Sequence, residues 1–154
     1  MGERSPINDT NARGTFIGMT MDTSRSDLVQ AVLEGVAFAI RDSVEVARSL
    51  GLEIPSTKIC GGGSKSPLWR TIFANVLGIP LEVLKTEQGP GYGGAMLAMV
   101  GCGQYESVQA AADALVEVAD RVEPDPELTA RYEARYQQFR TIYPALRQVF
   151  PQLL

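Results

Sequence analysis

The sequence predicts an α/β domain with a partly parallel sheet. A long helical pattern covers residues 24–50, a short strand and a glycine-rich turn lead into a second helix over residues 56–77, and another short strand covers residues 80–84. Helix, strand, helix and strand therefore alternate, and a helix that connects two strands of one sheet lets those strands run parallel. The length of 154 residues suits one domain, with an irregular lead-in over residues 1–23 and helices and strands over residues 24–154.

The composition is that of an ordinary globular protein, with 45% hydrophobic and 21% charged residues. The net charge of −4 argues against nonspecific binding of nucleic acid, which needs a basic surface. No apolar run approaches the length that spans a membrane. We therefore expect neither a nucleic-acid partner nor a membrane partner.

Histidine is absent, and the two cysteines, Cys60 and Cys102, do not form a C-x-x-C motif. This composition excludes a zinc site and a Ser-His-Asp triad. Two cysteines with no evident pairing and no signal peptide predict a reducing, cytoplasmic location.

Residues 1–23 are the least regular stretch, because turn-forming residues are scattered through it. We expect no helix or strand of its own in this lead-in. The turn-forming residues are Gly2, Ser5, Pro6, Asn8, Asp9, Asn11 and Gly14.

The helix over residues 24–50 is expected to begin at a cap formed by Ser24 or Ser26 and to end at Gly51. Its apolar side chains recur every three or four residues, and so wide an apolar face predicts deep packing against a sheet. Gly35 inside the helix costs about 1 kcal/mol relative to Ala, so we expect another backbone close to it. The apolar positions are Leu28, Val29, Val32, Leu33, Val36, Ile40, Val44 and Ala47.

Three charged residues, Glu34, Arg41 and Glu45, share the other face of this helix. Ion pairs on exposed helix faces are common and weak. We therefore interpret these residues as a solvated ladder of ion pairs.

The chain is organised around residues 56–69. A short strand ends at Cys60, three consecutive glycines follow, and Ser66 caps a helix that begins with Pro67. Three glycines in a row cost backbone entropy on ordering. A fold keeps them where a turn needs a positive φ or where the backbone must come close to a bound group.

The start of this helix leaves unpaired N–H groups and the positive end of the helix dipole facing the turn, an arrangement that suits a phosphate. The turn follows neither the P-loop pattern nor G-x-G-x-x-G. A glycine-rich turn with purely structural duties therefore explains the local pattern equally well.

The second helix covers residues 67–77, and Gly78 ends it. Trp69 could stack on a base, but a Trp in an amphipathic helix is more often core, so we assign Trp69 to the core. The apolar side chains of the helix are Leu68, Trp69, Ile72, Phe73, Val76 and Leu77.

A second glycine-rich turn begins at Glu87 and leads into a helix of small residues. We expect Gly93 and Gly94 to permit close packing of that helix. Glu87 by itself reads as a surface carboxylate near a helix start. A further helix is predicted from its cap at Ser107 to Ala119.

The last helix begins at about Glu127, after a rigid break over residues 123–126. Pro144 is expected to kink this helix or to end it at Tyr143. Its aromatic and apolar side chains follow helical spacing, which indicates packing more than a cofactor site. They are Tyr132, Tyr136, Phe139, Tyr143 and Leu146.

Several of these motifs, in this order, resemble the carboxy-terminal part of the FGGY family of carbohydrate kinases, closest to its xylulose kinase subgroup. Matching segments lie at residues 3–6 and 12–14 of the lead-in, residues 32–39, residues 61–70, and Glu87 with residues 92–95. The resemblance covers nearly the whole chain. Asn75 stands where many family members have Asp.

The resemblance implies the second, nucleotide-side domain of an actin-like ATPase or ribonuclease H-like sugar kinase fold, in incomplete form. It places Met1 in the middle of a sugar kinase, so the chain is expected to be a fragment that lacks the sugar-binding domain and the opening strands of its own domain. The exposed surface left by the missing domain is expected to favour association, which makes a homodimer an open expectation.

The implied function is ATP-dependent phosphorylation of a ketopentose, with xylulose as the candidate and with ATP and Mg²⁺ as cofactors. In such folds the glycine turn lies against the ribose and α-phosphate, whereas the helix dipole alone would suggest the terminal phosphates. Glu87 would help to order a metal-bound water or the helix start. The residues implied in nucleotide binding are Gly61, Gly62, Gly63, Ser64, Lys65, Ser66 and Glu87.

The catalytic base of such kinases lies in the missing domain, so no catalytic residue is assigned and the isolated chain is expected to be inactive. The ketopentose would bind through that amino-terminal domain. A non-catalytic actin-like interaction or regulatory module is the alternative, and nucleotide affinity would distinguish the two. A dinucleotide-binding domain of an oxidoreductase is disfavoured because G-x-G-x-x-G and the ribose carboxylate spacing are missing.

Overall fold

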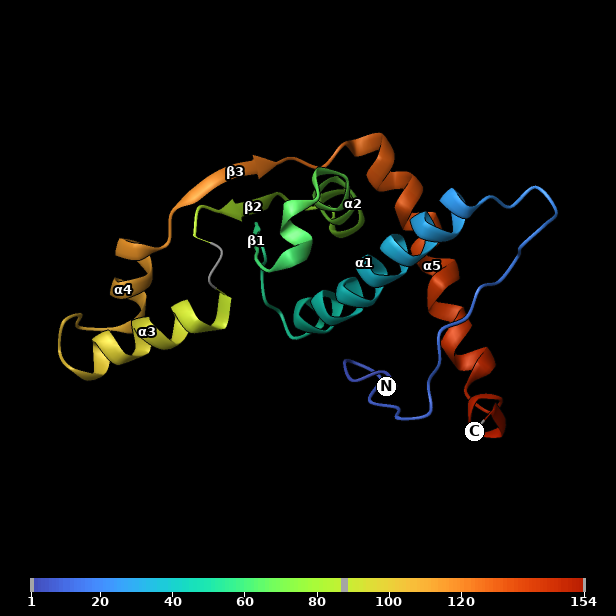
Figure 1. Ribbon diagram of the computed structural model, residues 1–154, viewed down its shortest axis with the longest axis horizontal. Coiled ribbons are helices and arrows are strands. Elements are labelled where there is room, and N and C mark those ends of the chain that lie inside the picture. The colour runs from blue at the N-terminus through green and yellow to red at the C-terminus, as the bar shows by residue number, and fades with distance from the viewer. Residues whose placement is uncertain (1, 87–88, 154) are drawn as a thin grey trace.

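The computed structural model describes residues 2–86 and 89–153. A small sheet, α1, α2 and α5 form the body of the molecule, and α3 and α4 pack on each other at one end of it (Figure 1). In chain order the elements are α1 (Arg25–Ser49), β1 (Thr57–Ile59), the 3₁₀ turn η1 (Gly62–Lys65), α2 (Pro67–Leu77), β2 (Leu81–Leu84), α3 (Gly89–Gly101), α4 (Val108–Leu115), β3 (Val118–Val122), α5 (Pro126–Leu146) and the 3₁₀ turn η2 (Phe150–Leu153).

The sheet has the strand order β1-β2-β3. β1 and β2 run parallel, with Thr57 opposite Leu81 and Ile59 opposite Val83, and α2 connects them. β2 and β3 run antiparallel, with Leu81 opposite Val122. The predicted partly parallel sheet is confirmed, and its middle strand buries the side chains of Leu81 and Val83.

The sequence predicted a helix from Ser107 to Ala119, and this prediction is wrong at its end, because strand β3 begins at Val118. The helix α4 has the expected cap at Ser107, but it ends at Leu115. The first four residues of β3 are exposed and only Val122 is half-buried, so the strand has no inward-facing apolar row that could reveal it in the sequence. Its backbone is extended because it pairs with β2.

Helix α1 begins and ends where local signals predict. The Ser24 hydroxyl accepts a hydrogen bond from the Asp27 N–H, and Asp27 accepts one from the Ser24 N–H in return, which completes a capping box. Gly51 follows the helix with a φ of +83°. Residues with side chains avoid that conformation, so Gly51 ends the helix as expected.

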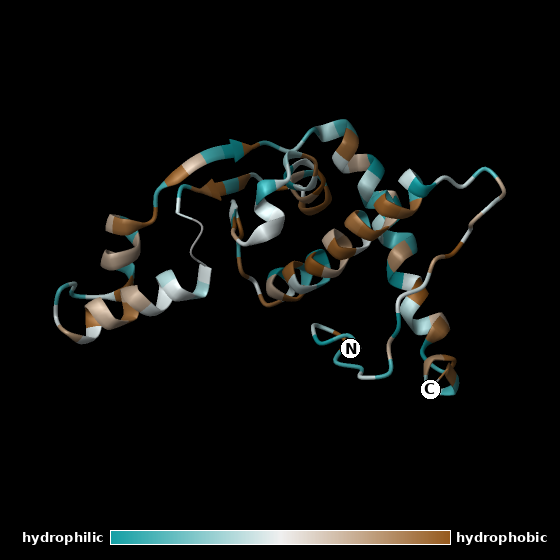
Figure 2. Ribbon diagram, in the orientation of Figure 1, coloured by the Kyte–Doolittle hydropathy of each residue, from teal (hydrophilic) through white to brown (hydrophobic). Residues whose placement is uncertain are grey.

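The predicted deep packing of the whole apolar face of α1 is wrong. α1 packs against α2 and α5, and the residues it buries are Ala37, Phe38 and Arg41. A stripe of four apolar side chains lies beside this contact and is 41–53% exposed; the hydropathy colouring marks apolar positions along α1 (Figure 2). We call it the α1 stripe: Val29, Val32, Val36 and Ile40.

The predicted solvated ladder of ion pairs on α1 is also wrong, because the charged face is the one that meets α5. Arg41 is buried there and pairs with Glu133 of α5 and with Glu45. Its guanidinium carbon lies 4.1 Å from the centroid of the Tyr136 ring, a cation–π contact. A buried guanidinium needs such partners, because an unpaired charge in this contact would be costly.

Glu34 makes the corresponding contacts nearer the start of α1. Its carboxylate accepts a 3.0 Å hydrogen bond from the Tyr132 hydroxyl and pairs with Arg135 at 3.2 Å. Burial, followed by the charge of Glu34, raises the pKa of Tyr132 to about 12. The charged face of α1 therefore packs against α5.

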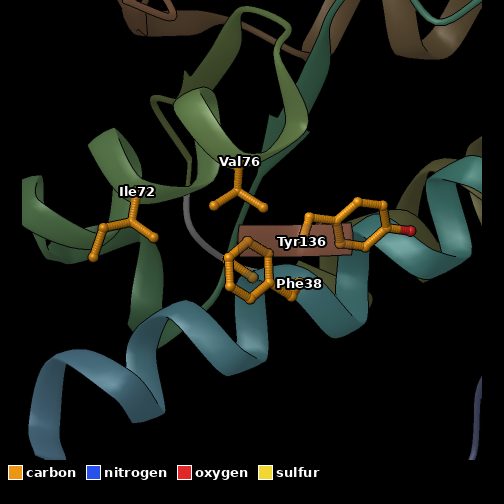
Figure 3. Packing of buried hydrophobic residues seen from close by; sticks show 5 residues of the cluster. Phe38, Ile72, Val76 and Tyr136 are labelled. Carbon is orange, nitrogen blue, oxygen red and sulfur yellow. The ribbon is translucent and has the colours of Figure 1, made fainter. Parts of the chain in front are cut away.

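The core lies between α1, α2 and α5, and Figure 3 shows its packing. The Phe38 ring centroid lies 6.0 Å from those of Tyr132 and Tyr136 and 5.3 Å from that of Phe139. Ile72 and Val76 of α2 complete the cluster. The aromatic row of α5 thus serves packing, as predicted.

Helix α5 is capped by Asp125, and Pro126 occupies its first position. The buried Asn75 of α2 accepts a 2.7 Å hydrogen bond from the Asp125 N–H and so ties the start of α5 to α2. Pro144 lies inside the helix, which continues to Leu146, so the predicted end at Tyr143 is not observed.

Of the lead-in, the described residues before α1 form no helix and no strand beyond one isolated antiparallel bridge between Glu3 and Asp9. Asp9 also accepts a 2.8 Å hydrogen bond from the Tyr143 hydroxyl of α5. This bond lowers the pKa of Asp9 and raises the pKa of Tyr143. The lead-in is thus held against the last helix.

Three helical glycines lack the close neighbours that the sequence suggested. A Cβ placed on Gly35, Gly93 or Gly94 would meet nothing within 4 Å among the described residues outside its own helix backbone and chain neighbours. The predictions that these glycines permit close packing are therefore wrong for the contacts within this chain. In the described ranges, no helix is both long enough and apolar enough to cross a membrane.

Candidate functional site

The triple-glycine turn follows β1 and precedes α2, as predicted. Cys60 leaves the strand, and Gly61 turns the chain with φ of 86° and ψ of −177°, a conformation open in practice only to glycine. The Gly61 carbonyl then accepts two hydrogen bonds from Ser64, one of 3.1 Å from its N–H and one of 2.6 Å from its hydroxyl. These bonds close the 3₁₀ turn η1, which the sequence did not predict.

Helix α2 starts directly after this turn. The Ser66 hydroxyl accepts a 3.3 Å hydrogen bond from the Trp69 N–H, and Pro67 takes the first helical position. The Ser66 N–H donates to the Gly63 carbonyl at 3.2 Å. The predicted strand, glycine turn and capped helix are confirmed, and Gly78, with a φ of +64°, ends α2.

The three glycines are there for different reasons. Gly61 needs its positive φ. A Cβ on Gly63 would lie 2.7 Å from Cζ3 and 2.8 Å from Cε3 of Trp69, which is too close for any side chain. Gly62 has no positive φ, and a Cβ on it would meet nothing within 4 Å in the described parts of the chain. Gly62 is therefore the glycine that this chain's own packing does not explain.

The predicted nucleotide-binding residues differ in how far they are exposed to solvent. Gly61, Gly62 and Lys65 are exposed, and Gly63 and Ser66 are half-buried. Ser64 is 1% exposed, and its hydroxyl points to the Gly61 carbonyl, so its side chain stabilises the turn. Six predicted residues therefore form one continuous surface turn, Gly61, Gly62, Gly63, Ser64, Lys65 and Ser66, whereas Glu87 lies outside the described residues.

Two neighbours on α2 support this turn, and sequence reasoning missed both contacts. Trp69 is core, as predicted, but its ring also packs against Gly63. Arg70 donates from Nε to the Ser64 carbonyl at 2.5 Å and from Nη1 to Asp120 of β3 at 3.2 Å. No spacing rule connects an arginine to a carbonyl six residues earlier, so the sequence held no signal for this contact.

The arrangement is suited to binding a ligand by its backbone. An exposed glycine backbone at Gly62 offers close approach, the start of α2 directs its positive dipole end toward the turn, and Lys65 adds a positive charge. The turn contains no carboxylate, histidine or cysteine that could act as a base or nucleophile. Its geometry therefore supports positioning of an anionic ligand.

Comparison with known proteins identifies the family of the chain. The chain is 34% identical to the xylulose kinase of Staphylococcus epidermidis over 153 residues, which cover 99% of this chain and 31% of that protein. It is also 34% identical to the ribulokinase of Halalkalibacterium halodurans over 148 residues, 92% of this chain and 26% of that protein. The chain thus spans less than a third of the length of these curated relatives.

The structure superimposes on that of the ligand-bound xylulose kinase from Lactobacillus acidophilus with a TM-score of 0.89, covering 98% of this chain and 31% of that one at 24% identity. This similarity shows that the fold is that of the actin-like sugar kinases. Residues 1–102 match the C-terminal domain of the FGGY family of carbohydrate kinases. The chain therefore belongs to the FGGY family of carbohydrate kinases.

Proposed function

We propose that this chain supplies the adenosine side of the ATP site in a kinase that phosphorylates a ketopentose. The observation that carries the proposal is Gly62, an exposed glycine that neither a positive φ nor a neighbouring atom among the described residues explains. A backbone without a Cβ lets a flat or charged group come within contact distance. Ribose and α-phosphate are such groups.

The substrate class follows from the names of the relatives. One is a xylulose kinase and another a ribulokinase, and xylulose and ribulose are both ketopentoses. Xylulose is our first candidate. Phosphoryl transfer depends on positioning of the phosphates, on Mg²⁺ and on a base for the attacking hydroxyl. Of these three requirements, the turn contributes to the positioning of ATP. We therefore assign it a binding role and assign no catalytic residue.

Mg²⁺ is a cofactor in this proposal. Among the residues that the structure describes, no group of three or more Cys, Asp and Glu side chains could hold a metal ion. Mg²⁺ in kinases is bound through substrate phosphates, water and one or two protein carboxylates. We propose that it arrives with ATP.

Substitution of Gly62 tests the proposal. Gly62→Val should leave the fold intact, because a Cβ at this position would meet nothing within 4 Å among the described residues, and should abolish nucleotide binding, because the side chain fills the approach to the backbone. An NMR titration with ADP detects even weak binding, and circular dichroism reports the fold. Gly101→Val, another glycine whose Cβ would meet nothing within 4 Å, is the matched control far along the chain.

The outcomes separate the candidate functions. Binding of ADP to wild type and to Gly101→Val, but not to folded Gly62→Val, supports the proposal. Equal affinity in all three proteins would remove the turn from the site. A folded wild-type chain with no ADP affinity would favour a non-catalytic actin-like module. The homodimer and the cytoplasmic location stay predictions.

A further inference from the structure

We propose that Trp69 and Arg70 are positioning residues that hold the triple-glycine turn in its ligand-ready conformation. Neither is among the residues expected to touch the nucleotide. The inference rests on the proposed function, because it assigns to these two side chains the shape of the surface that the nucleotide would meet.

Trp69 supports the turn at Gly63. Its Cζ3 and Cε3 atoms occupy the space that a Cβ of residue 63 would need, so the indole ring lies directly against the Gly63 backbone. A ring in van der Waals contact with a backbone limits how far that backbone can move inward.

The ring of Trp69 is itself fixed. Its Nε1–H donates a 3.2 Å hydrogen bond to the Leu33 carbonyl of α1, and its centroid lies 5.6 Å from that of Phe73. The backbone N–H of Trp69 also donates a hydrogen bond to the Ser66 hydroxyl. Trp69 therefore connects the turn to α1 and to the core.

Arg70 holds the turn one residue further on. Its Nε donates to the carbonyl of the buried Ser64, and its Nη1 pairs with Asp120 on β3. A planar guanidinium that makes two such bonds has little freedom left. The Ser64 carbonyl is thereby fixed relative to the sheet.

These contacts flank the exposed glycine. Gly61 is fixed by its φ and by two hydrogen bonds from Ser64, and Gly63 is fixed by Trp69. Gly62 lies between two held positions, although glycine is the most flexible residue in an unsupported chain. A preformed turn binds more tightly, because the ligand does not have to order it.

Amide hydrogen exchange on the nucleotide-free chain tests the positioning directly. Trp69→Leu and Arg70→Met should each accelerate exchange in residues 61–66 by about tenfold while the amides of α5 stay protected, because the turn opens locally. Phe139→Leu is the matched control, since it removes a ring of the same cluster that packs on Phe38 of α1. It should leave exchange in residues 61–66 unchanged.

A rescue experiment excludes a merely structural effect. Gly63→Ala should accelerate exchange in the turn in wild type, because the new methyl group overlaps the Trp69 ring. The same substitution in the Trp69→Leu background should add less than a twofold change, because Leu leaves room for the methyl group. Additive effects, or a turn that exchanges at the wild-type rate in both Trp69→Leu and Arg70→Met, would overturn the positioning role.

The link to the nucleotide is measured separately. ADP titrations of the same variants should show about tenfold weaker binding for Trp69→Leu and Arg70→Met, and wild-type affinity for Phe139→Leu. Faster exchange with unchanged ADP affinity would overturn the inference. If wild type binds no ADP, the proposed function fails, and the exchange data alone still decide whether these residues hold the turn.

Discussion

The Tyr136 hydroxyl of α5 donates a 2.6 Å hydrogen bond to Oδ1 of Asp42 on α1, across the interface between the two helices. Tyr136 is 1% exposed, so its hydroxyl depends on this partner. Burial, followed by the hydrogen bond to Asp42, raises the pKa of Tyr136. The bond therefore joins α1 and α5 beside the core.

Tyr136→Phe should destabilise the fold by about 2 kcal/mol, because it removes a hydrogen bond to a charged acceptor. Urea unfolding followed by circular dichroism measures the loss. Asp42→Asn in the Tyr136→Phe background should then cost less than it does in wild type, because the shared bond is already absent. Strictly additive losses would contradict a direct coupling.

The free energy of unfolding should fall as pH rises from about 10 to 12. In the folded protein the pKa of Tyr132 is raised to about 12, mainly by burial and then by Glu34, from an ordinary value of 10.0, and that of Tyr136 is raised as well. The unfolded chain thus loses phenol protons first and binds fewer protons across this range, so stability is fully present below pH 10 and is lost above it.

Urea unfolding at pH 8, 10 and 11 checks this dependence. The double variant Tyr132→Phe with Tyr136→Phe should show a flatter pH profile than wild type. A wild-type profile that stays level to pH 11, or a variant with the same slope as wild type, would show that these phenols do not control alkaline stability.

Asn75→Ala should cost about 2 kcal/mol of stability, because it leaves the Asp125 N–H without its acceptor at the start of α5. Asn75→Asp keeps an oxygen acceptor near a helix N-terminus and should cost less than half as much. Thermal unfolding of both variants measures the difference. Similar losses in the two would show that packing, and not the hydrogen bond, decides the effect.

Lys65→Ala should weaken binding of ATP more than binding of adenosine, by about 1 kcal/mol, if the lysine charge acts on phosphate as a partly solvated contact. Competition titrations with the two ligands measure the difference. Lys58→Ala, which removes a lysine of β1 that pairs with Glu82, is the matched control and should change neither affinity. An equal loss for ATP and adenosine would place Lys65 away from phosphate.

The chain by itself should show no sugar kinase activity. The glycine turn binds a part of ATP whose contacts change little in the transition state, so it cannot by itself lower the barrier to phosphoryl transfer. A coupled assay for ADP release, with xylulose and Mg²⁺ at saturating concentrations, is the measurement. Turnover above background would mean that a base lies within these residues, and Glu87 would be the first to substitute.

The limits of α1 and α2 were predictable because they depend on neighbours in the chain. The capping pair of Ser24 and Asp27 and the cap at Ser66 each act within three residues. Gly51 and Gly78 end helices through their own positive φ. Membership of the family was predictable for the same reason, because short motifs in a fixed order identify it.

The sequence by itself determined where α1 and α2 begin and end, that a glycine turn precedes α2, and which side chains are apolar. Only the tertiary structure decided which of those side chains are covered. α5 packs on the charged face of α1 and buries Arg41, while the α1 stripe stays exposed. Amphipathic periodicity shows that a helix has two faces, but the position of its neighbours determines which face is buried.

The tertiary structure also decided the roles of the three glycines, which are identical in sequence. Trp69 excludes a side chain at Gly63, the backbone angle excludes one at Gly61, and neither excludes one at Gly62. A steric requirement comes from atoms that the fold brings close, here from a helix residue six positions further along the chain. No pattern of neighbouring residues records those distances, so only the folded structure could show that the packing of the described residues does not explain Gly62.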